Sequence, residues 1–203
     1  MIEIIENCSP YYIKFTFPKL EEIVSFAKSL EPDYSRSIKL PTFIHEYHSI
    51  ENAKKIINML PFAELFPWQY SRVSPIVTMP YGGSNIHKDG KTTKTSFNLP
   101  IEILDDKCVT YWYADEELAD CLKIDTGATE ARRADGWESK PRKPLKITVQ
   151  RSNEMILFNT DIFHRWDNSK SNNFRTVLTF RTDPKFDDEL TFEKVSSVLL
   201  AHS

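Results

Sequence analysis

Three residues have the types and the spacing for metal chemistry: His87, Asp89 and His164. His87 and Asp89 lie two residues apart after the turn residues 81–84, so an imidazole and a carboxylate at a strand end can face the same ion. A single pair of this kind is weak evidence, because short motifs also arise by chance. His164 strengthens it, because it follows the apolar run 155–158 and supplies a second imidazole.

Two imidazoles and one carboxylate on one face of a six-coordinate ion leave three positions open, as in the facial triad of non-haem Fe(II) enzymes. Arg175, 11 residues after His164, adds a fourth element. A buried guanidinium requires an anionic partner, because an unpaired buried charge is costly, and its planar fork matches a carboxylate. Arg181 lies on the same face of the same predicted strand and is the alternative for this role.

The residues around these positions alternate with the period of β-strands. Phe97, Leu99 and Ile101 share one face of a run in which polar side chains share the other. The predicted strands cover residues 11–17, 70–79, 94–101, 108–113, 145–150, 154–159 and 174–181. Two N-terminal helices are predicted where apolar side chains recur at helical spacing, in residues 19–30 and 50–60. The sequence therefore predicts a mainly β protein with N-terminal helices, in which about eight antiparallel strands form a jelly roll.

We expect one domain over residues 1–203. Residues 1–69 would support the jelly roll, residues 70–182 would form its catalytic core, and residues 183–203 would be a C-terminal extension. Residues 114–144 interrupt the strand pattern with many charged side chains. A loop of this length inside a compact domain is usually functional or disordered. Two interpretations stay open: a mobile lid beside the metal opening and a solvated linker.

Composition argues against several classes of protein. The 203 residues carry 26 Lys and Arg against 29 Asp and Glu, a formal net charge of −3 at pH 7, which argues against a globally basic nucleic-acid binder. No run approaches the roughly 18 apolar residues of a membrane span, and the acidic start lacks the features of a signal peptide. Cys8, Cys108 and Cys121 are widely spaced, so no disulfide framework or zinc site is expected, and the predicted location is the cytoplasm.

Together, His87, Asp89, His164 and Arg175 make the chain resemble the 2-oxoglutarate/Fe(II)-dependent dioxygenases. The resemblance covers somewhat more than half of the chain, and the predicted strands match the cupin-like double-stranded β-helix of this superfamily. It is similar in particular to the prolyl hydroxylase and aspartyl/asparaginyl β-hydroxylase branches. The resemblance implies that the two histidines and the aspartate bind Fe(II), that Arg175 binds the distal carboxylate of 2-oxoglutarate, and that Asn98 contacts this co-substrate.

One position departs from the pattern of the superfamily. Many members have a polar residue two positions after the arginine, where this chain has Val177. Thr179 lies on the same side of the predicted strand and is the nearest polar alternative.

The activity that the resemblance implies is oxidation of a C–H bond, most simply hydroxylation, coupled to the conversion of 2-oxoglutarate and dioxygen into succinate and carbon dioxide. The substrate, a small molecule or a peptide side chain, is not indicated by the sequence. Two alternatives stay open. A cupin-like metalloenzyme that does not use 2-oxoglutarate has no need of Arg175, and a non-catalytic jelly-roll binding module needs no metal.

The other histidines and the tryptophans are interpreted as structural. His45 and His48 lack the His-Glu-x-x-His spacing of zinc proteases, so we expect them on the surface or in the scaffold. Trp112 and Tyr113 are typical core or rim residues. Trp166, two residues after a predicted ligand, is the better candidate for the rim of the site.

Overall fold

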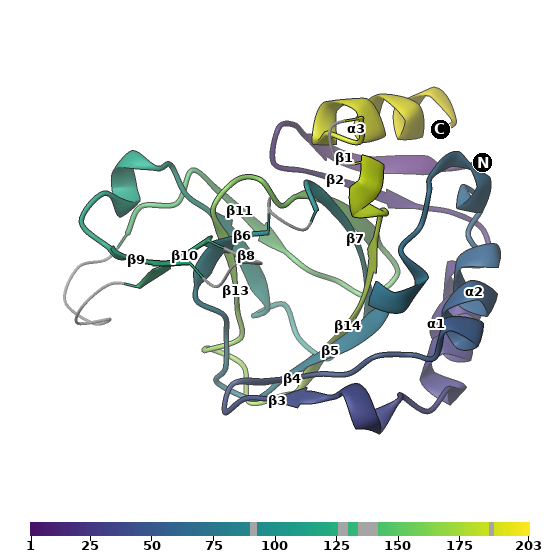
Figure 1. Cartoon of the computed structure of the whole chain (residues 1–203), viewed down its shortest axis with the longest axis horizontal. Helices are drawn as coiled ribbons and strands as arrows, with labels where there is room; N and C mark the ends of the chain where they lie inside the picture. Colours follow the sequence, from purple (N-terminus) through teal and green to yellow (C-terminus); the bar gives the residue numbers. More distant parts are fainter. Residues whose placement is uncertain (90–92, 126–129, 134–141, 187–188) are drawn as a thin grey trace.

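The computed structural model describes residues 1–89, 93–125, 130–133, 142–186 and 189–203. In this part of the chain two antiparallel β-sheets, of eight and six strands, face each other, and helices lie outside the larger sheet (Figure 1). The predicted fold, a mainly β jelly roll with N-terminal helices, is confirmed. Among the described residues, no helix combines the length and the apolar character needed to cross a membrane.

The larger sheet carries the predicted 2-oxoglutarate contacts on its central strands. In spatial order its strands are β1 (Glu3–Cys8), β2 (Tyr12–Thr16), β12 (Met155–Asn159), β7 (Thr95–Ile103), β14 (Arg175–Arg181), β5 (Ser74–Thr78), β4 (Phe43–His45) and β3 (Ile38–Lys39). β14 pairs with β7 on one side, where Thr179 lies opposite Asn98, and with β5 on the other, where Thr179 lies opposite Ser74. The strands predicted at 94–101 and 174–181 thus become neighbours.

The smaller sheet carries the predicted metal ligands. In spatial order its strands are β11 (Lys146–Val149), β8 (Val109–Trp112), β13 (His164–Asp167), β6 (Ile86–Lys88), β10 (Glu130–Arg133) and β9 (Leu122–Asp125). β6 and β13 pair at its centre. Strands that carry His87 and His164 side by side are what a jelly roll predicts, but both are too short for a clear alternation of polar and apolar residues, so their bounds could not be read from the sequence.

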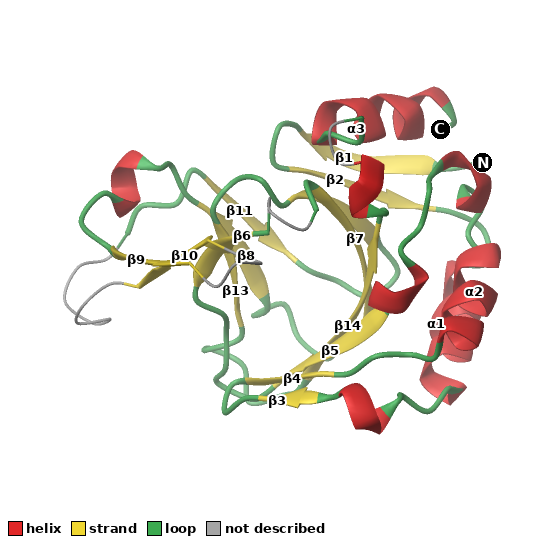
Figure 2. Cartoon of the chain, in the orientation of Figure 1, coloured by secondary structure: helices red, strands yellow, loops and turns green. Residues whose placement is uncertain are grey.

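Three helices pack outside the larger sheet (Figure 2). They are α1 (Leu20–Ser29), α2 (Ile50–Asn58) and α3 (Phe192–Ala201), and short 3-10 turns lie at Tyr34–Arg36, Ala63–Leu65, Tyr70–Arg72, Glu116–Leu118 and Pro184–Phe186. The side chain of Ser49 caps α2 by accepting a hydrogen bond from Asn52 N at 3.2 Å. α3 was not predicted, although it lies in the expected C-terminal extension.

The two faces of β7 have opposite roles. Phe97 and Leu99 are fully buried and belong to the hydrophobic core that the helices share with the larger sheet. Burying a side chain of this size contributes about 1.5–3 kcal/mol. Ser96 and Asn98, on the other face, line the cavity between the sheets. The main hydrophobic core therefore lies between the larger sheet and the helices, and polar side chains line the cavity between the two sheets.

The segment 114–144 differs from the expectation of a strandless loop or solvated linker. Its described part contains a 3-10 turn and the β9–β10 hairpin, and β10 pairs with β6, so that Ala131 lies opposite His87. Of the described residues of this segment, Ile124 and Ala131 line the cavity, and the charged residues around them make this short alternation hard to see in the sequence. The hairpin does lie beside the predicted metal site. Residues 126–129 and 134–141 of the predicted lid lie outside the described residues.

Candidate metal centre

The pairing of β6 with β13 brings the three predicted ligands together. His164, the first residue of β13, lies opposite His87, and their ring centroids are 4.6 Å apart. Asp89 follows β6 directly, and one of its oxygens, Oδ1, lies 3.7 Å from His87 Nε2. One ligand atom from each of the three residues lies within 4.8 Å of the other two. The arrangement can hold a metal ion.

The turn before β6 has a steric reason for its glycines. A Cβ atom on Gly82 would lie 2.5 Å from the carbonyl oxygen of Thr42 and 2.9 Å from that of Met79. The neighbouring residue, Tyr81, has a positive φ of 58°. Backbone packed this closely admits only glycine at position 82. The turn thereby fixes the start of β6 and, with it, the place of His87.

Hydrogen bonds set the tautomer of both histidines. His87 Nδ1 lies 2.8 Å from the carbonyl oxygen of Asn85, and His164 Nδ1 lies 2.9 Å from that of Ile162. A carbonyl oxygen only accepts, so each Nδ1 carries the proton and each neutral ring keeps its lone pair on Nε2. Metal-binding histidines are usually oriented in this way. Two imidazole nitrogens and a carboxylate oxygen fit a divalent first-row metal ion.

The charges of the site favour the ligand forms of these groups. Burial opposes ionisation of Asp89, but the charge of Arg181, followed by those of His87 and His164, outweighs it and lowers the pKa of Asp89 to about 2. Burial, reinforced by the neighbouring His87, lowers the pKa of His164 to about 4. At neutral pH the structure therefore presents an ionised carboxylate and, at His164, a neutral imidazole.

Arg181 forms an ion pair with the predicted ligand Asp89. Its Nη2 atom donates to Asp89 Oδ2 at 2.9 Å, and both side chains are largely buried. This contact holds one carboxylate oxygen and leaves Oδ1 on the side of His87. Arg181, the alternative to Arg175 for a carboxylate ligand, therefore already has an acidic partner within the protein.

Arg175 has quite different surroundings. It is 5% exposed, and its guanidinium donates from Nε and Nη2 to the amide oxygen of Gln150 and from Nη1 to the hydroxyl of Thr78. The Nε distance is 2.7 Å and the Nη1 distance is 3.3 Å. No carboxylate of the described residues forms an ion pair with it. Burial lowers its pKa to about 10, so it stays charged at neutral pH.

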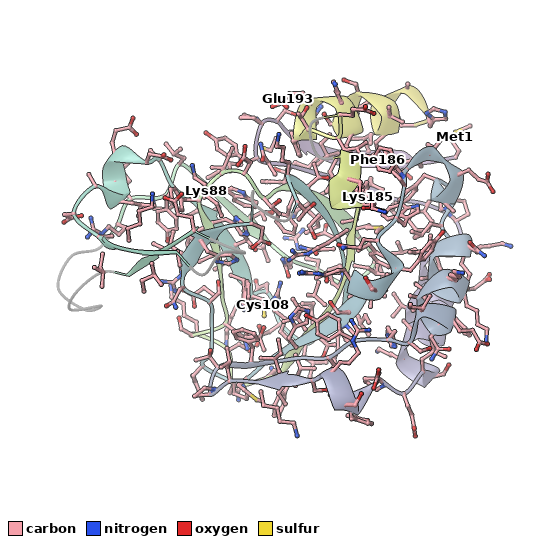
Figure 3. All side chains as sticks on the ribbon, in the orientation of Figure 1. Met1, Lys88, Cys108, Lys185, Phe186 and Glu193 are labelled. Atoms are coloured by element: carbon pink, nitrogen blue, oxygen red, sulfur yellow. The ribbon has the colours of Figure 1, made fainter. Side chains whose placement is uncertain are left out.

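A cavity of about 470 Å³ between the two sheets contains all of these groups. Figure 3 shows side chains of both sheets pointing into the space between the sheets. The cavity lies within the range of about 300–1,000 Å³ typical of small-molecule sites. The cavity is lined by His87, Asp89 and His164, here called the ligand cluster, and by Arg175 and Arg181. Its other lining residues include Asn98, Ser96, Thr110, Gln150, Val177 and Thr179. Alternate residues of β14 therefore face inward, as the strand period predicts.

The structure also shows the positions of Trp166, the expected rim residue, and of three further polar residues that the sequence did not assign to the site. His45 was expected on the surface or in the scaffold, but it lines the cavity, with Nε2 2.7 Å from Ser74 Oγ. His48 is buried, so a surface position is wrong for it. Trp166 lines the cavity with its ring 5.7 Å from that of His87. Gln150 gave no signal, because a lone amide at a strand end is unremarkable until its partner is known.

Fold and site together describe one class of protein. Its members are jelly rolls that hold a cluster of two histidines and one carboxylate between their two sheets. No protein-family model matches the chain, and no curated protein matches its sequence. The structure is similar to that of the epimerase SnoN in complex with Fe3+, alpha ketoglutarate and nogalamycin RO, with a TM-score of 0.53 and 11% identity over 85% of this chain and 78% of that one. Such identity shows the fold alone.

Two further solved structures are similar. HygX from Streptomyces hygroscopicus, with nickel and 2-oxoglutarate bound, has a TM-score of 0.51 and 9% identity over 87% of this chain and 84% of that one. Oxalate decarboxylase from Bacillus subtilis has a TM-score of 0.39 and 10% identity over 77% of this chain and 28% of that one. The chain spans less than a third of the length of the oxalate decarboxylases that it matches. The two facing sheets, together with the similarity to SnoN and HygX, show a cupin-like jelly roll.

Proposed function

We propose that the protein is an Fe(II)- and 2-oxoglutarate-dependent oxygenase, most simply a hydroxylase. The observation that carries the proposal is the guanidinium of Arg175, which is buried in the cavity of the ligand cluster without an acidic partner among the described residues. An unpaired buried charge is costly. A site that keeps one is suited to an anionic ligand that supplies the missing charge.

2-Oxoglutarate has the chemistry that this cavity requires, because it carries a chelating 2-oxo acid at one end and a second carboxylate at the other. His87, Asp89 and His164 would hold the metal, and Arg175 would bind the far carboxylate. When bound, Fe(II) and 2-oxoglutarate supply the oxidising chemistry, in which 2-oxoglutarate, dioxygen and a C–H bond give succinate, carbon dioxide and an alcohol. The protein provides orientation and a partly enclosed cavity.

The alternatives explain less of the cavity. A cupin-like metalloenzyme without 2-oxoglutarate leaves Arg175 without a use, and a binding module leaves the ligand cluster without one. The crystal structures of SnoN and HygX each contain a metal together with 2-oxoglutarate or alpha ketoglutarate, which agrees with the proposal.

The test is a 2-oxoglutarate titration of protein loaded with Ni(II), comparing the wild type with Arg175→Met. Hydrogen bonds to charged groups contribute about 1.5–3 kcal/mol, so the variant should bind at least about tenfold more weakly while its Ni(II) content stays unchanged. Arg151→Ala is the matched control, since it removes an exposed guanidinium next to Gln150 in sequence but outside the cavity. Its affinity for 2-oxoglutarate should equal that of the wild type.

A second measurement tests the reaction itself. With Fe(II) and dioxygen, the wild type should release succinate from 2-oxoglutarate, and candidate substrates should increase the rate. If the wild type binds the metal but not 2-oxoglutarate, the cupin-like alternative replaces this proposal. If it binds neither, the binding module does.

A further inference from the structure

The cavity carries more positive charge than the proposed co-substrate uses. Among its described lining residues are three arginines, Arg72, Arg175 and Arg181, but only one acid, Asp89. This local excess contrasts with the net charge of −3 of the whole chain. A divalent metal adds two positive charges, and 2-oxoglutarate offsets two. A net positive charge remains after both have bound, so an anionic third ligand is favoured.

Arg72 lies at the metal end of the cavity. It is the last residue of the 3-10 turn Tyr70–Arg72, and Val73 separates it from β5. Because Ser74 of β5 lies opposite Thr179 of β14, the antiparallel register leads Arg72 toward Arg181. Gln69 N, at the start of the same turn, donates to the carbonyl oxygen of Arg181 at 2.8 Å, which ties the turn to this end of β14.

The guanidinium of Arg72 has its donors available. It makes no hydrogen bond or ion pair with the part of the chain that the structure describes, although it is only partly exposed. Its charge nevertheless acts on the metal end, because it contributes to lowering the pKa of both Asp89 and His45. Arg181 differs in this respect, since its guanidinium is engaged with Asp89.

Part of the cavity wall is apolar. The β3–β4 hairpin contributes Ile38, Leu40 and Phe43, and the first two are 48% and 46% exposed. The β9–β10 hairpin contributes Ile124 and Ala131. The two hairpins extend from different sheets (Figure 1). Exposed apolar side chains lining a cavity favour a ligand with an apolar body.

We propose that Arg72 binds an anionic group of the substrate, a carboxylate or a phosphate, while the apolar body of that substrate lies against the β3–β4 hairpin. This inference rests on the proposed function, because it assigns a substrate class to the same site. The cavity volume indicates a small molecule as the occupant. Arg72 is thus assigned as a specificity-determining residue, separate from Arg175 with its role toward 2-oxoglutarate.

The experiment measures binding of matched six-carbon probes to protein already loaded with Ni(II) and saturating 2-oxoglutarate. The probes are hexanoate, hexyl phosphate, hexanamide and hexylamine, so that tail and length stay constant while the charge changes. The wild type should bind one of the two anions at least about tenfold more tightly than the amide, and the tighter anion identifies the group. Arg72→Gln should abolish this preference, and Arg72→Lys should retain part of it, because lysine keeps the charge but lacks the fork.

Arg36→Ala is the matched control. Arg36 donates to the carbonyl oxygen of Ser71, next to Arg72, but it does not line the cavity. This variant should keep the preference for anions. The inference is overturned if the amide or the amine binds the wild type as well as both anions do, if no probe binds, or if Arg72→Gln leaves the preference intact.

The 2-oxoglutarate titration is repeated for each variant and separates the two proposals. Arg72→Gln should bind 2-oxoglutarate like the wild type. If it instead binds 2-oxoglutarate tenfold more weakly, Arg72 belongs to the co-substrate and the substrate assignment is wrong. If the wild type binds no 2-oxoglutarate, the proposed function fails, and this is observed before any probe is added.

Discussion

The two ends of β14 present the same side chain to the same cavity in different surroundings. Arg181, at the metal end, donates to Asp89 at 2.9 Å. Arg175, six residues earlier on the same face, is surrounded by neutral partners, the amide of Gln150 and the hydroxyl of Thr78. Arg175 is 5% exposed and the side chain of Arg181 is 15% exposed, so the two differ mainly in their partners and less in their burial.

The role of each guanidinium depends on the partner that it contacts. At one end the positive charge of Arg181 compensates the carboxylate of Asp89, the predicted metal ligand, and holds one of its oxygens, in the manner of the outer-shell contacts that position metal ligands. At the other end the charge has no such task within the described residues. Arg181 therefore belongs to the candidate metal centre, whereas Arg175 forms no ion pair with a carboxylate of the described residues.

The largest expected effect separates the two arginines by stability. Arg181→Met removes the guanidinium that pairs with the buried carboxylate of Asp89, so the metal-free protein should lose about 3–5 kcal/mol of unfolding free energy. Arg175→Met removes a buried charge that has only neutral partners, so this variant should lose much less unfolding free energy. Urea unfolding of both variants measures the difference. Equal losses would show that the two ends do not differ as the contacts indicate.

Metal affinity gives the next largest effect. His164→Ala removes one of the three predicted ligands. Loss of a residue that only orients a ligand can weaken metal binding by up to about 100-fold, so loss of the ligand itself should weaken Ni(II) binding by at least about as much. Arg175→Met should bind Ni(II) like the wild type, because Arg175 lies at the other end of the strand. Calorimetric titration of both variants checks this. A metal site that survives the loss of His164 would refute the three-ligand assignment.

Gln150→Glu makes the two ends alike. The amide oxygen of Gln150 already accepts from two nitrogens of Arg175, so a carboxylate of the same shape gives Arg175 the acidic partner that Arg181 already has. 2-Oxoglutarate should then bind at least about tenfold more weakly, with unchanged affinity for Ni(II). Unaltered binding of 2-oxoglutarate would mean that its far carboxylate lies elsewhere.

The smallest expected effect uses His45 as a reporter of the metal end. Burial, and then the charges of Arg181 and Arg72, lower its pKa to about 4. Removing a nearby positive charge favours the protonated imidazole, so the pKa should rise in Arg181→Met and stay unchanged in Arg175→Met. NMR titration of the His45 ring, assigned by comparison with His45→Gln, measures both values. If the pKa of His45 rises in Arg175→Met and not in Arg181→Met, His45 responds to the Arg175 end of β14 and the prediction is wrong.

Stability depends on the same histidine. The folded pKa of about 4 lies below the ordinary value of 6.5, so the unfolded chain binds the proton more readily. The corresponding stability is present above pH 6.5 and is lost as the pH falls from 6.5 toward 4. His45→Gln removes this contribution, and its unfolding free energy should depend less on pH in that window.

Much of the fold was readable from the sequence, because strand and helix periods are local properties. Phe97 and Leu99 alternate with polar neighbours and are buried as predicted, and Ser49 caps the second helix. The β9–β10 hairpin was not predicted, since its few apolar residues stand among charges. Its strands depend on pairing with β6, which is distant in sequence.

For the site, the sequence by itself determined which residue types were available: two histidines, one aspartate and two arginines of the same strand parity. Only the tertiary structure decided which arginine faces Asp89 and which faces Gln150. It alone brought Arg72 to the same cavity. The physical reason is that parity fixes the face of a strand on which a side chain lies. Its partners and net charge are set by strands that pair across the sheets from remote parts of the chain.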